Sequence, residues 1–478
     1  MQFNSFIFIL VYLPILIIGY FGLNRISSVA GKFFLIIASA FFYIYGGWNI
    51  ALILAVSIVL NYFCAVIIRR TKRLLWGGIF LNIALLFYFK YFNFFISTVN
   101  NVFKGEFTER EIILPLGISF LTFQQIMYLV NVYNKNIDKV HLSDYLAYIL
   151  YFPKLLMGPI VEPKELISQI NDLELHHINW DNISYGIKIF SFGLFKKLIF
   201  ADTFSTAVAW GYANIDASTS MDWFLVMLFY TFEIYFDFSG YCDMAIGVST
   251  MLNINLPMNF DSPYTAVSIR DFWKRWHISL TSFLTQYVYI PLGGNKKGKV
   301  RTYVNTMIVF VVSGIWHGAN WTFILWGVLH GLLSIFDRIF EKAKRNLFEV
   351  VKWGTTFLAV NILWLLFRSE SITQWKDILI KMYSFQSTEI SDGLIGSFLL
   401  PETSFLFKIL NLEALNTTVR GLNLLIFTIA AFVICLVPDN NYNTLKRNNW
   451  ITLILSVIAF VWSFLCLSSE SFFVYFNF

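Results

Sequence analysis

Three histidines stand in one largely apolar stretch of the sequence, residues 236–331: His277, His317 and His330. Ionisable groups at membrane depth are costly to bury, so they are candidates for function. An imidazole titrates near neutrality and can take a proton from a hydroxyl group, which is the work of a general base. Glycines beside His317 permit close approach of a ligand or of a second backbone. A buried histidine that hydrogen bonds to a neighbouring helix explains the same pattern equally well.

The spacing of the histidines limits which of them can act together. His317 and His330 are 13 positions apart, which is about 20 Å along a continuous helix. Both can lie at one reacting centre only if the helix breaks between them. We therefore interpret His330 as a structural hydrogen-bonding residue. His277 belongs to a separate segment and could approach His317 across a cavity.

Charged residues concentrate next to these histidines. The segment Arg270–His277 carries three cations, one acid and three aromatic residues. It is typical of an interfacial helix, and it would equally suit a cationic mouth for the phosphates of a cytoplasmic donor. Asp237 begins a second polar cluster that ends at Asp243. It predicts local turn and cap hydrogen bonds, or a carboxylate that orients a histidine or pairs with Arg275.

Composition determines the kind of fold that must position these residues. The 478 residues are 57% hydrophobic, 19% aromatic and 13% charged, with a mean hydropathy of +0.64. A soluble domain has about 25% charged residues. These percentages exclude a disordered, coiled-coil, collagen-like or disulfide-stapled chain. They predict an all-α, polytopic membrane protein. The four cysteines show no metal-ligand spacing, and the net charge of +6 gives no support to nucleic-acid binding, so we expect neither a metal site nor a nucleic-acid partner.

Apolar runs predict roughly 11–13 transmembrane or re-entrant helices, several of them short for a bilayer that needs about 20 residues per span. The candidate spans are Phe6–Leu23, Phe33–Tyr45, Trp48–Ile68, Leu74–Ile96, Leu114–Val132, Tyr145–Gly158, Tyr185–Ala201, Trp223–Phe238, Tyr303–Trp316, Trp321–Ile339, Val351–Phe367, Leu424–Val437 and Ile451–Leu467.

Charges in the connections predict the orientation and the domain organisation. Basic clusters at residues 69–73, 296–301 and 338–345 are expected in the cytoplasm. The Ser369–Gly421 connection is expected outside, and its apolar patches predict a folded cap or surface helix. We expect one membrane-embedded domain over residues 1–478, with a motif-rich core at about 110–340 and extra spans with an outer loop at about 350–478.

A set of motifs in a fixed order carries a resemblance to a known family. They are Leu114-Pro-Leu-Gly-Ile-Ser-Phe, Phe152-Pro-Lys with Gly158-Pro-Ile, Tyr235-Phe-Asp-Phe-Ser-Gly-Tyr, Phe272-Trp-Lys-Arg-Trp-His-Ile-Ser-Leu, Tyr289-Ile-Pro-Leu-Gly-Gly-Asn and Gly314-Ile-Trp-His-Gly-Ala-Asn-Trp-Thr-Phe. The chain resembles the membrane-bound O-acyltransferases, in particular the bacterial branch of alginate and peptidoglycan O-acetyltransferases. The resemblance covers most of the chain and is weakest after about Trp375.

The resemblance implies helices around a central tunnel in a bacterial cytoplasmic (inner) membrane protein. In the family the histidine of the Trp-His-Gly motif, here His317, is catalytic, and the second tunnel histidine corresponds to His277. Members take an acyl group from a cytoplasmic thioester, here expected to be acetyl-CoA with no bound cofactor. They pass it outward to an esterase-like partner or a glycan. Lys274 stands where an arginine is common.

Further residues are candidates for lining the tunnel or binding the donor: Trp273, Arg275, Trp316, Asn320 and Asp237. Asn320 or a backbone N–H near Gly318 could stabilise an oxyanion. Two alternative functions are D-alanyl transfer to teichoic acid by a related branch, and a transporter or lipid flippase. The second would require inverted repeats, and the sequence shows none.

Overall fold

The computed structural model describes residues 1–344, 346–436, 441–446, 449–467 and 473, and these residues are helical or irregular, without a named strand. Within this part of the chain, the segments long and apolar enough to cross a membrane are Phe8–Ile26, Lys72–Phe103, Trp321–Ile339, Glu349–Arg368 and Thr418–Leu436. Shorter apolar helices cover Ser28–Ile44, Ala51–Ile67 and Trp450–Leu465. The predicted all-α polytopic membrane fold is confirmed.

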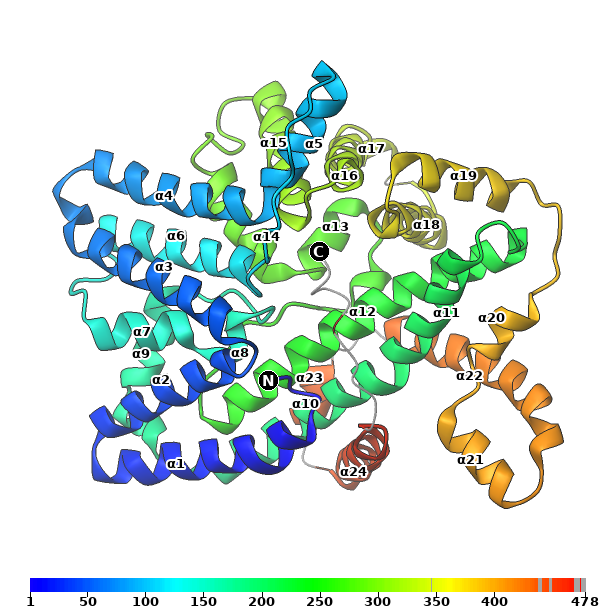
Figure 1. Cartoon of the computed structure of the whole chain (residues 1–478), viewed down its shortest axis with the longest axis horizontal. Coiled ribbons are helices and arrows are strands. Elements are labelled where there is room, and N and C mark those ends of the chain that lie inside the picture. The colour runs from blue at the N-terminus through cyan, green and yellow to red at the C-terminus, as the bar shows by residue number, and fades with distance from the viewer. Residues whose placement is uncertain (345, 437–440, 447–448, 468–472, 474–478) are drawn as a thin grey trace. The chain divides into compact units, whose positions relative to one another are not determined.

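Contacts between residues divide the chain into two compact units. The first comprises residues 1–193, 241–258 and 448–457. Within it α1 and α2 lie side by side (Figure 1). Its helices are α1 (Leu13–Ile26), α2 (Ser28–Ile44), α3 (Trp48–Ile67), α4 (Lys72–Leu86), α5 (Phe92–Phe103), α6 (Ile118–Tyr133), α7 (Leu142–Leu150), α8 (Phe152–Leu155), α9 (Pro163–Asn171) and most of α10 (Trp180–Phe195).

The second unit comprises residues 194–240, 259–447 and 458–478 and holds all three histidines of the sequence-based site. Its helices are α11 (Asp202–Ala213), the first part of α12 (Ser220–Met251), α13 (Ile269–Arg275), α14 (Ile278–Leu284), α15 (Lys299–His317), α16 (Trp321–Ile339), α17 (Glu341–Lys344), α18 (Glu349–Arg368), α19 (Ile372–Tyr383), α20 (Asp392–Gly396), α21 (Pro401–Ile409), α22 (Asn416–Leu436), α23 (Asn441–Lys446) and part of α24 (Trp450–Leu465).

Two regions allow a direct comparison with the sequence-based spans. The Ser369–Gly421 connection is folded into helices α19, α20 and α21, as its apolar patches predicted. The span predicted to end at Phe238 is instead part of α12, which continues to Met251. The prediction of a turn at the Asp237–Asp243 cluster was therefore wrong. Val437, the end of another predicted span, and Arg345, in a basic cluster, lie outside the described residues.

Glycine lets α15 and α16 pack against each other with their backbones in near contact. A Cβ on Gly314 would lie 2.4 Å from the carbonyl oxygen of Phe323, and one on Gly327 would lie 2.4 Å from that of Phe310. Both distances are far below ordinary van der Waals contact. The contacts pair the end of α15 with the start of α16, so the two helices form an antiparallel hairpin.

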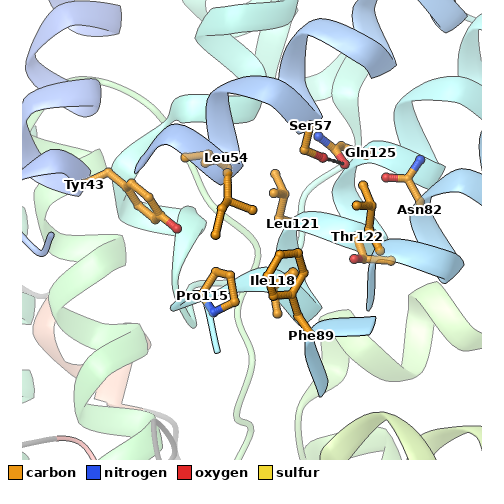
Figure 2. A pocket seen from close by; sticks show the side chains of 12 residues that line it. Tyr43, Leu54, Ser57, Asn82, Phe89, Pro115, Ile118, Leu121, Thr122 and Gln125 are labelled. Atoms are coloured by element: carbon orange, nitrogen blue, oxygen red, sulfur yellow. Dashed lines mark hydrogen bonds between the residues drawn. The ribbon is translucent and has the colours of Figure 1, made fainter. Parts of the chain in front are cut away.

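Buried amides join α3, α4 and α6 in the first unit. The Ser57 hydroxyl and the Asn61 amide both donate to Gln125 Oε1 at 3.1 Å, and Asn82 Nδ2 donates to Asn61 Oδ1 at 2.6 Å. Ser57, Gln125 and Asn82 line a small cavity of about 20 Å³. Figure 2 shows these three residues on one side of it, with the apolar side chains of Leu121 and Ile118 below them. Hydrogen bonds between amides of this kind hold membrane helices together without a hydrophobic driving force.

Candidate active site

His317 is the last residue of α15 and is buried, with 6% of its surface exposed. The chain reverses immediately after it because Asn320 starts the next helix. Asn320 Oδ1 accepts a hydrogen bond from the backbone N–H of Thr322 at 3.1 Å, which is a standard helix N-cap. Asn320 Nδ2 donates to the carbonyl of Glu370 at 2.8 Å. The helix break that the histidine spacing required is therefore present.

Aromatic rings surround His317. Its ring centroid lies 5.0 Å from that of Trp316, 5.1 Å from Trp326 and 5.3 Å from Phe367, each in an edge-to-face arrangement. These rings belong to α15, α16 and α18, so the packing of the three helices determines where the imidazole points. An apolar shell of this kind excludes water and strengthens electrostatic interactions inside it.

His330 contacts the same tryptophan, Trp326. Its ring centroid is 4.6 Å from that of Trp326, and its Nδ1 accepts a hydrogen bond from Trp273 Nε1 at 3.2 Å. The predicted structural hydrogen bond is thus present. The reversal of the chain also brings His330 to an indole that His317 contacts.

His277 reaches this region from the turn between α13 and α14. Its backbone has φ of 46°, a left-handed conformation that costs a non-glycine residue of the order of 1–3 kcal/mol and clusters at functional sites. Asn259 holds the turn, because its carbonyl and Oδ1 accept hydrogen bonds from the N–H groups of Ile278 and Ser279 at 3.0 and 3.1 Å.

The surroundings of His277 are aromatic as well. The ring lies 4.8 Å from Phe238 and 6.3 Å from Trp316, the residue that precedes His317. It is outside the helices long enough to cross a membrane. Burial lowers its pKa to about 3, because the imidazolium would lose its hydration. The ring is therefore neutral at pH 7 and can give or accept a hydrogen bond.

The basic segment pairs with nearby acids. Arg275 Nε lies 3.0 Å from Asp271 Oδ1, four residues before it, and Arg270 lies 3.2 Å from Glu341. Both arginines are about one-third exposed. Asp337 on α16 accepts the N–H of Ile269 at 2.6 Å and so caps the start of α13.

Asp237 was considered as a partner of Arg275 or of a histidine, and the structure gives it a different one. Its Oδ1 lies 2.8 Å from Lys197 Nζ, which also lies 2.9 Å from Asp202 Oδ1. Lys197 and Asp237 each have 1% of their side-chain surface exposed. The pairing with Arg275 was thus wrong, because a buried lysine on the neighbouring segment takes up the Asp237 carboxylate.

Sequence reasoning missed Lys197. It lies in the π-helix Lys196–Ala201, inside an apolar run that was interpreted only as a span. Two adjacent lysines in such a run are a signal in themselves, since intramembrane cations need a charged partner or a function. Over the described part of the chain, no group of three histidine, cysteine or acidic side chains is placed to hold a metal ion.

Comparisons with known proteins bear on the family of the chain. The model of the MBOAT, membrane-bound O-acyltransferase family, matches residues 37–368. The chain is similar to the peptidoglycan O-acetyltransferase of Helicobacter pylori, at 35% identity over 100% of this chain and 97% of the relative. It is 36% identical to the probable alginate O-acetylase AlgI of Pseudomonas aeruginosa over 82% of this chain and 76% of that protein. A teichoic acid D-alanyltransferase of Bacillus subtilis is 29% identical over 52% and 65% of the two chains.

Proposed function

Since the chain belongs to the membrane-bound O-acyltransferase family, we propose that it transfers an acetyl group from cytoplasmic acetyl-CoA through the membrane for O-acetylation of an exported or cell-wall polysaccharide. Its relatives named for alginate and peptidoglycan support an acceptor of that type. The observation that carries the proposal is His317, buried among aromatic rings where α15 meets α16.

His317 acts as the general base. It accepts the proton of the acceptor hydroxyl as the hydroxyl oxygen forms a bond to the thioester carbonyl carbon. The carbon–sulfur bond then breaks, and the departing thiolate takes the proton from the imidazolium. Holding both reactants in a narrow, dry site contributes proximity worth up to several kcal/mol, and a positioned base contributes about 10²–10⁴-fold.

The neighbouring residues orient these groups. Trp316 lies between His317 and His277, in ring contact with each. His277, held neutral, serves as a hydrogen-bonding partner in the tunnel. Trp273 acts indirectly by holding His330. Arg275 and the exposed Lys274 face the donor phosphates, while the adenine nucleotide stays in the cytoplasm and the acyl arm enters.

The site of action is the bacterial cytoplasmic membrane. The apolar helices support a multi-pass protein there, and the outward product is an acetyl ester. An extracytoplasmic esterase-like protein receives the acetyl group, or the glycan receives it directly. This partner selects the polysaccharide.

The test measures ester-linked groups that mild base releases from purified wall and exopolysaccharide fractions. A strain lacking the gene is complemented with the wild type, with His317→Ala, or with His141→Ala, which changes an exposed histidine outside the site. We expect acetate to fall on deletion and to be restored by the wild type and by His141→Ala, but not by His317→Ala.

Other outcomes would contradict parts of the proposal. Loss of D-alanine instead of acetate would place the chain in the D-alanyl branch. The similarity to the teichoic acid D-alanyltransferase of Bacillus subtilis covers only about half of this chain. Normal acetylation by His317→Ala, with the protein present in the membrane, would remove His317 from catalysis. Flux of a solute through reconstituted protein without thioester consumption would favour a transporter.

A further inference from the structure

One face of α16 carries polar side-chain atoms that form no hydrogen bond with the rest of the described chain. Thr322, Trp326 and His330 follow one another at intervals of four residues, and each has 0% of its surface exposed. Residues four apart lie on the same side of a helix. Thr322 Oγ1, Trp326 Nε1 and His330 Nε2 each lack a hydrogen-bond partner among the described residues.

The hydrogen bond from Trp273 fixes the tautomer of His330. An indole nitrogen only donates, so His330 Nδ1, which receives the Trp273 N–H at 3.2 Å, must be the unprotonated nitrogen of the neutral ring. The proton is therefore on Nε2. His330 and Trp326, one turn apart on α16, each present an N–H donor that finds no acceptor in the described part of the chain.

Two buried donors without an acceptor are costly and need an explanation. Packing alone does not supply one, because the contacts of an indole ring with its neighbours do not require its N–H to lack an acceptor. The indole of Trp326 contacts the rings of both His317 and His330. One unpaired donor therefore belongs to a ring that contacts the proposed base, and the other belongs to a ring that contacts the same indole.

We propose that Trp326 Nε1–H and His330 Nε2–H donate hydrogen bonds to the carbonyl oxygen of the acyl thioester. As the acceptor hydroxyl adds to the carbonyl carbon, the π electron pair moves onto this oxygen, and the two donors stabilise the resulting negative charge. The pair returns as the carbon–sulfur bond breaks. Fixed donors aimed at developing charge in a dry site are an effective means of catalysis.

The side chain of Asn320 is less suited to this task. Its Oδ1 caps α16 and its Nδ2 donates to the Glu370 carbonyl. The inference rests on the proposed function, because it assumes an acyl thioester beside His317. It assigns a role to two residues for which the sequence indicated either none or a purely structural one.

The test separates the donor role from a packing role by pairing variants that remove a proposed donor with variants of similar size change that keep it. Trp326→Phe keeps an aromatic ring and removes the N–H. His330→Asn keeps an oxygen that can accept from Trp273 but has nothing at the Nε2 position, whereas His330→Gln restores an N–H near that position. Trp375→Phe in α19 is the control, because that indole already donates to the carbonyl of Ile362 in α18 at 3.3 Å.

Purified full-length protein in detergent is titrated with acetyl-CoA and with S-ethyl-CoA, which has a methylene in place of the carbonyl. We expect the wild type to bind acetyl-CoA about tenfold more tightly, the effect of a hydrogen bond worth about 1.4 kcal/mol. The preference should become smaller in Trp326→Phe and in His330→Asn, since each of these variants keeps one of the two donors. It should persist in full in His330→Gln and Trp375→Phe. Acetyl-pantetheine and its S-ethyl analogue, run in parallel, show whether the nucleotide is needed.

Turnover gives an independent readout. The loss of one such donor should lower kcat by about 100-fold, while KM should rise only as far as the affinity for acetyl-CoA falls. A wild type that binds both probes equally, or an unchanged preference in Trp326→Phe and His330→Asn, would overturn the inference while leaving the acyltransferase proposal intact. Failure of the wild type to bind any of these thioesters would overturn the proposed donor and the inference with it.

Discussion

Replacing Gly314 with alanine should displace His317 from its aromatic partners. The new Cβ would lie 2.4 Å from the Phe323 carbonyl oxygen, so α15 and α16 must separate by about 1 Å to restore ordinary contact. Overpacking of this kind costs about 1–3 kcal/mol of stability. A misplacement of 1 Å can cost about 100-fold in rate, and the ring contact of His317 with Trp326 spans the same helix pair.

The assay compares the thermal unfolding midpoint and the acetyl-transfer rate of purified Gly314→Ala with those of the wild type. Gly327→Ala should behave alike, because its Cβ would lie 2.4 Å from the Phe310 carbonyl oxygen. The control is Gly354→Ala in α18, where nothing lies within 4 Å of the added Cβ. This control should keep full activity and change stability by no more than about 1 kcal/mol.

In the Gly314 variant one separation of α15 and α16 should cause both the loss of stability and the loss of rate. A protein with Gly314→Ala that unfolds and turns over like the wild type would refute this link. In that case the close approach of the two helices would not be what positions the imidazole. A loss of stability without loss of rate would show that the hairpin tolerates separation at its catalytic end.

Two other substitutions follow from buried charges and caps. Lys197→Met leaves the carboxylates of Asp237 and Asp202 without their shared cation and should lower the free energy of unfolding by about 3–5 kcal/mol. Adding Asp237→Leu should recover part of this loss. An unchanged thermal unfolding midpoint in the single variant would contradict a buried ion cluster. Asp337→Ala removes the acceptor of the Ile269 N–H and should lower the free energy of unfolding by about 0.5–2 kcal/mol. Asp337→Asn keeps an oxygen at this position and should lose less stability. An equal loss in both variants would assign the effect to the charge of Asp337 and not to the cap.

Hydropathy predicted where the long apolar helices lie, although several of them begin or end a few residues away from the apolar run. The span Trp321–Ile339 agrees with α16 at both ends, where Asn320 supplies a cap at the start. The prediction failed at α12 because polar residues from Asp237 onward interrupt the apolar pattern. A helix surrounded by protein tolerates such residues when a partner such as Lys197 neutralises them.

The sequence indicated which residues are candidates for the site better than it indicated which of them pair with each other. The motifs identified His317 and His277, and whether those residues catalyse acyl transfer stays a prediction. Which groups pair depends on the packing of segments far apart in sequence, as for Lys197 and Asp237, 40 positions apart. The donor at His330 Nε2 was equally hidden, because only the contact with Trp273 from another segment reveals the tautomer.

The hairpin of α15 and α16 has a consequence for the energetics of moving an acyl group. Lys299 and His317 stand at opposite ends of α15, about 27 Å apart by helical rise. With the basic end in the cytoplasm, as the charge distribution predicts, the imidazole lies toward the outer leaflet. The acyl group then makes most of the journey on its thioester arm. Since an acetyl group carries no charge, the electrical potential across the membrane neither assists nor opposes its movement.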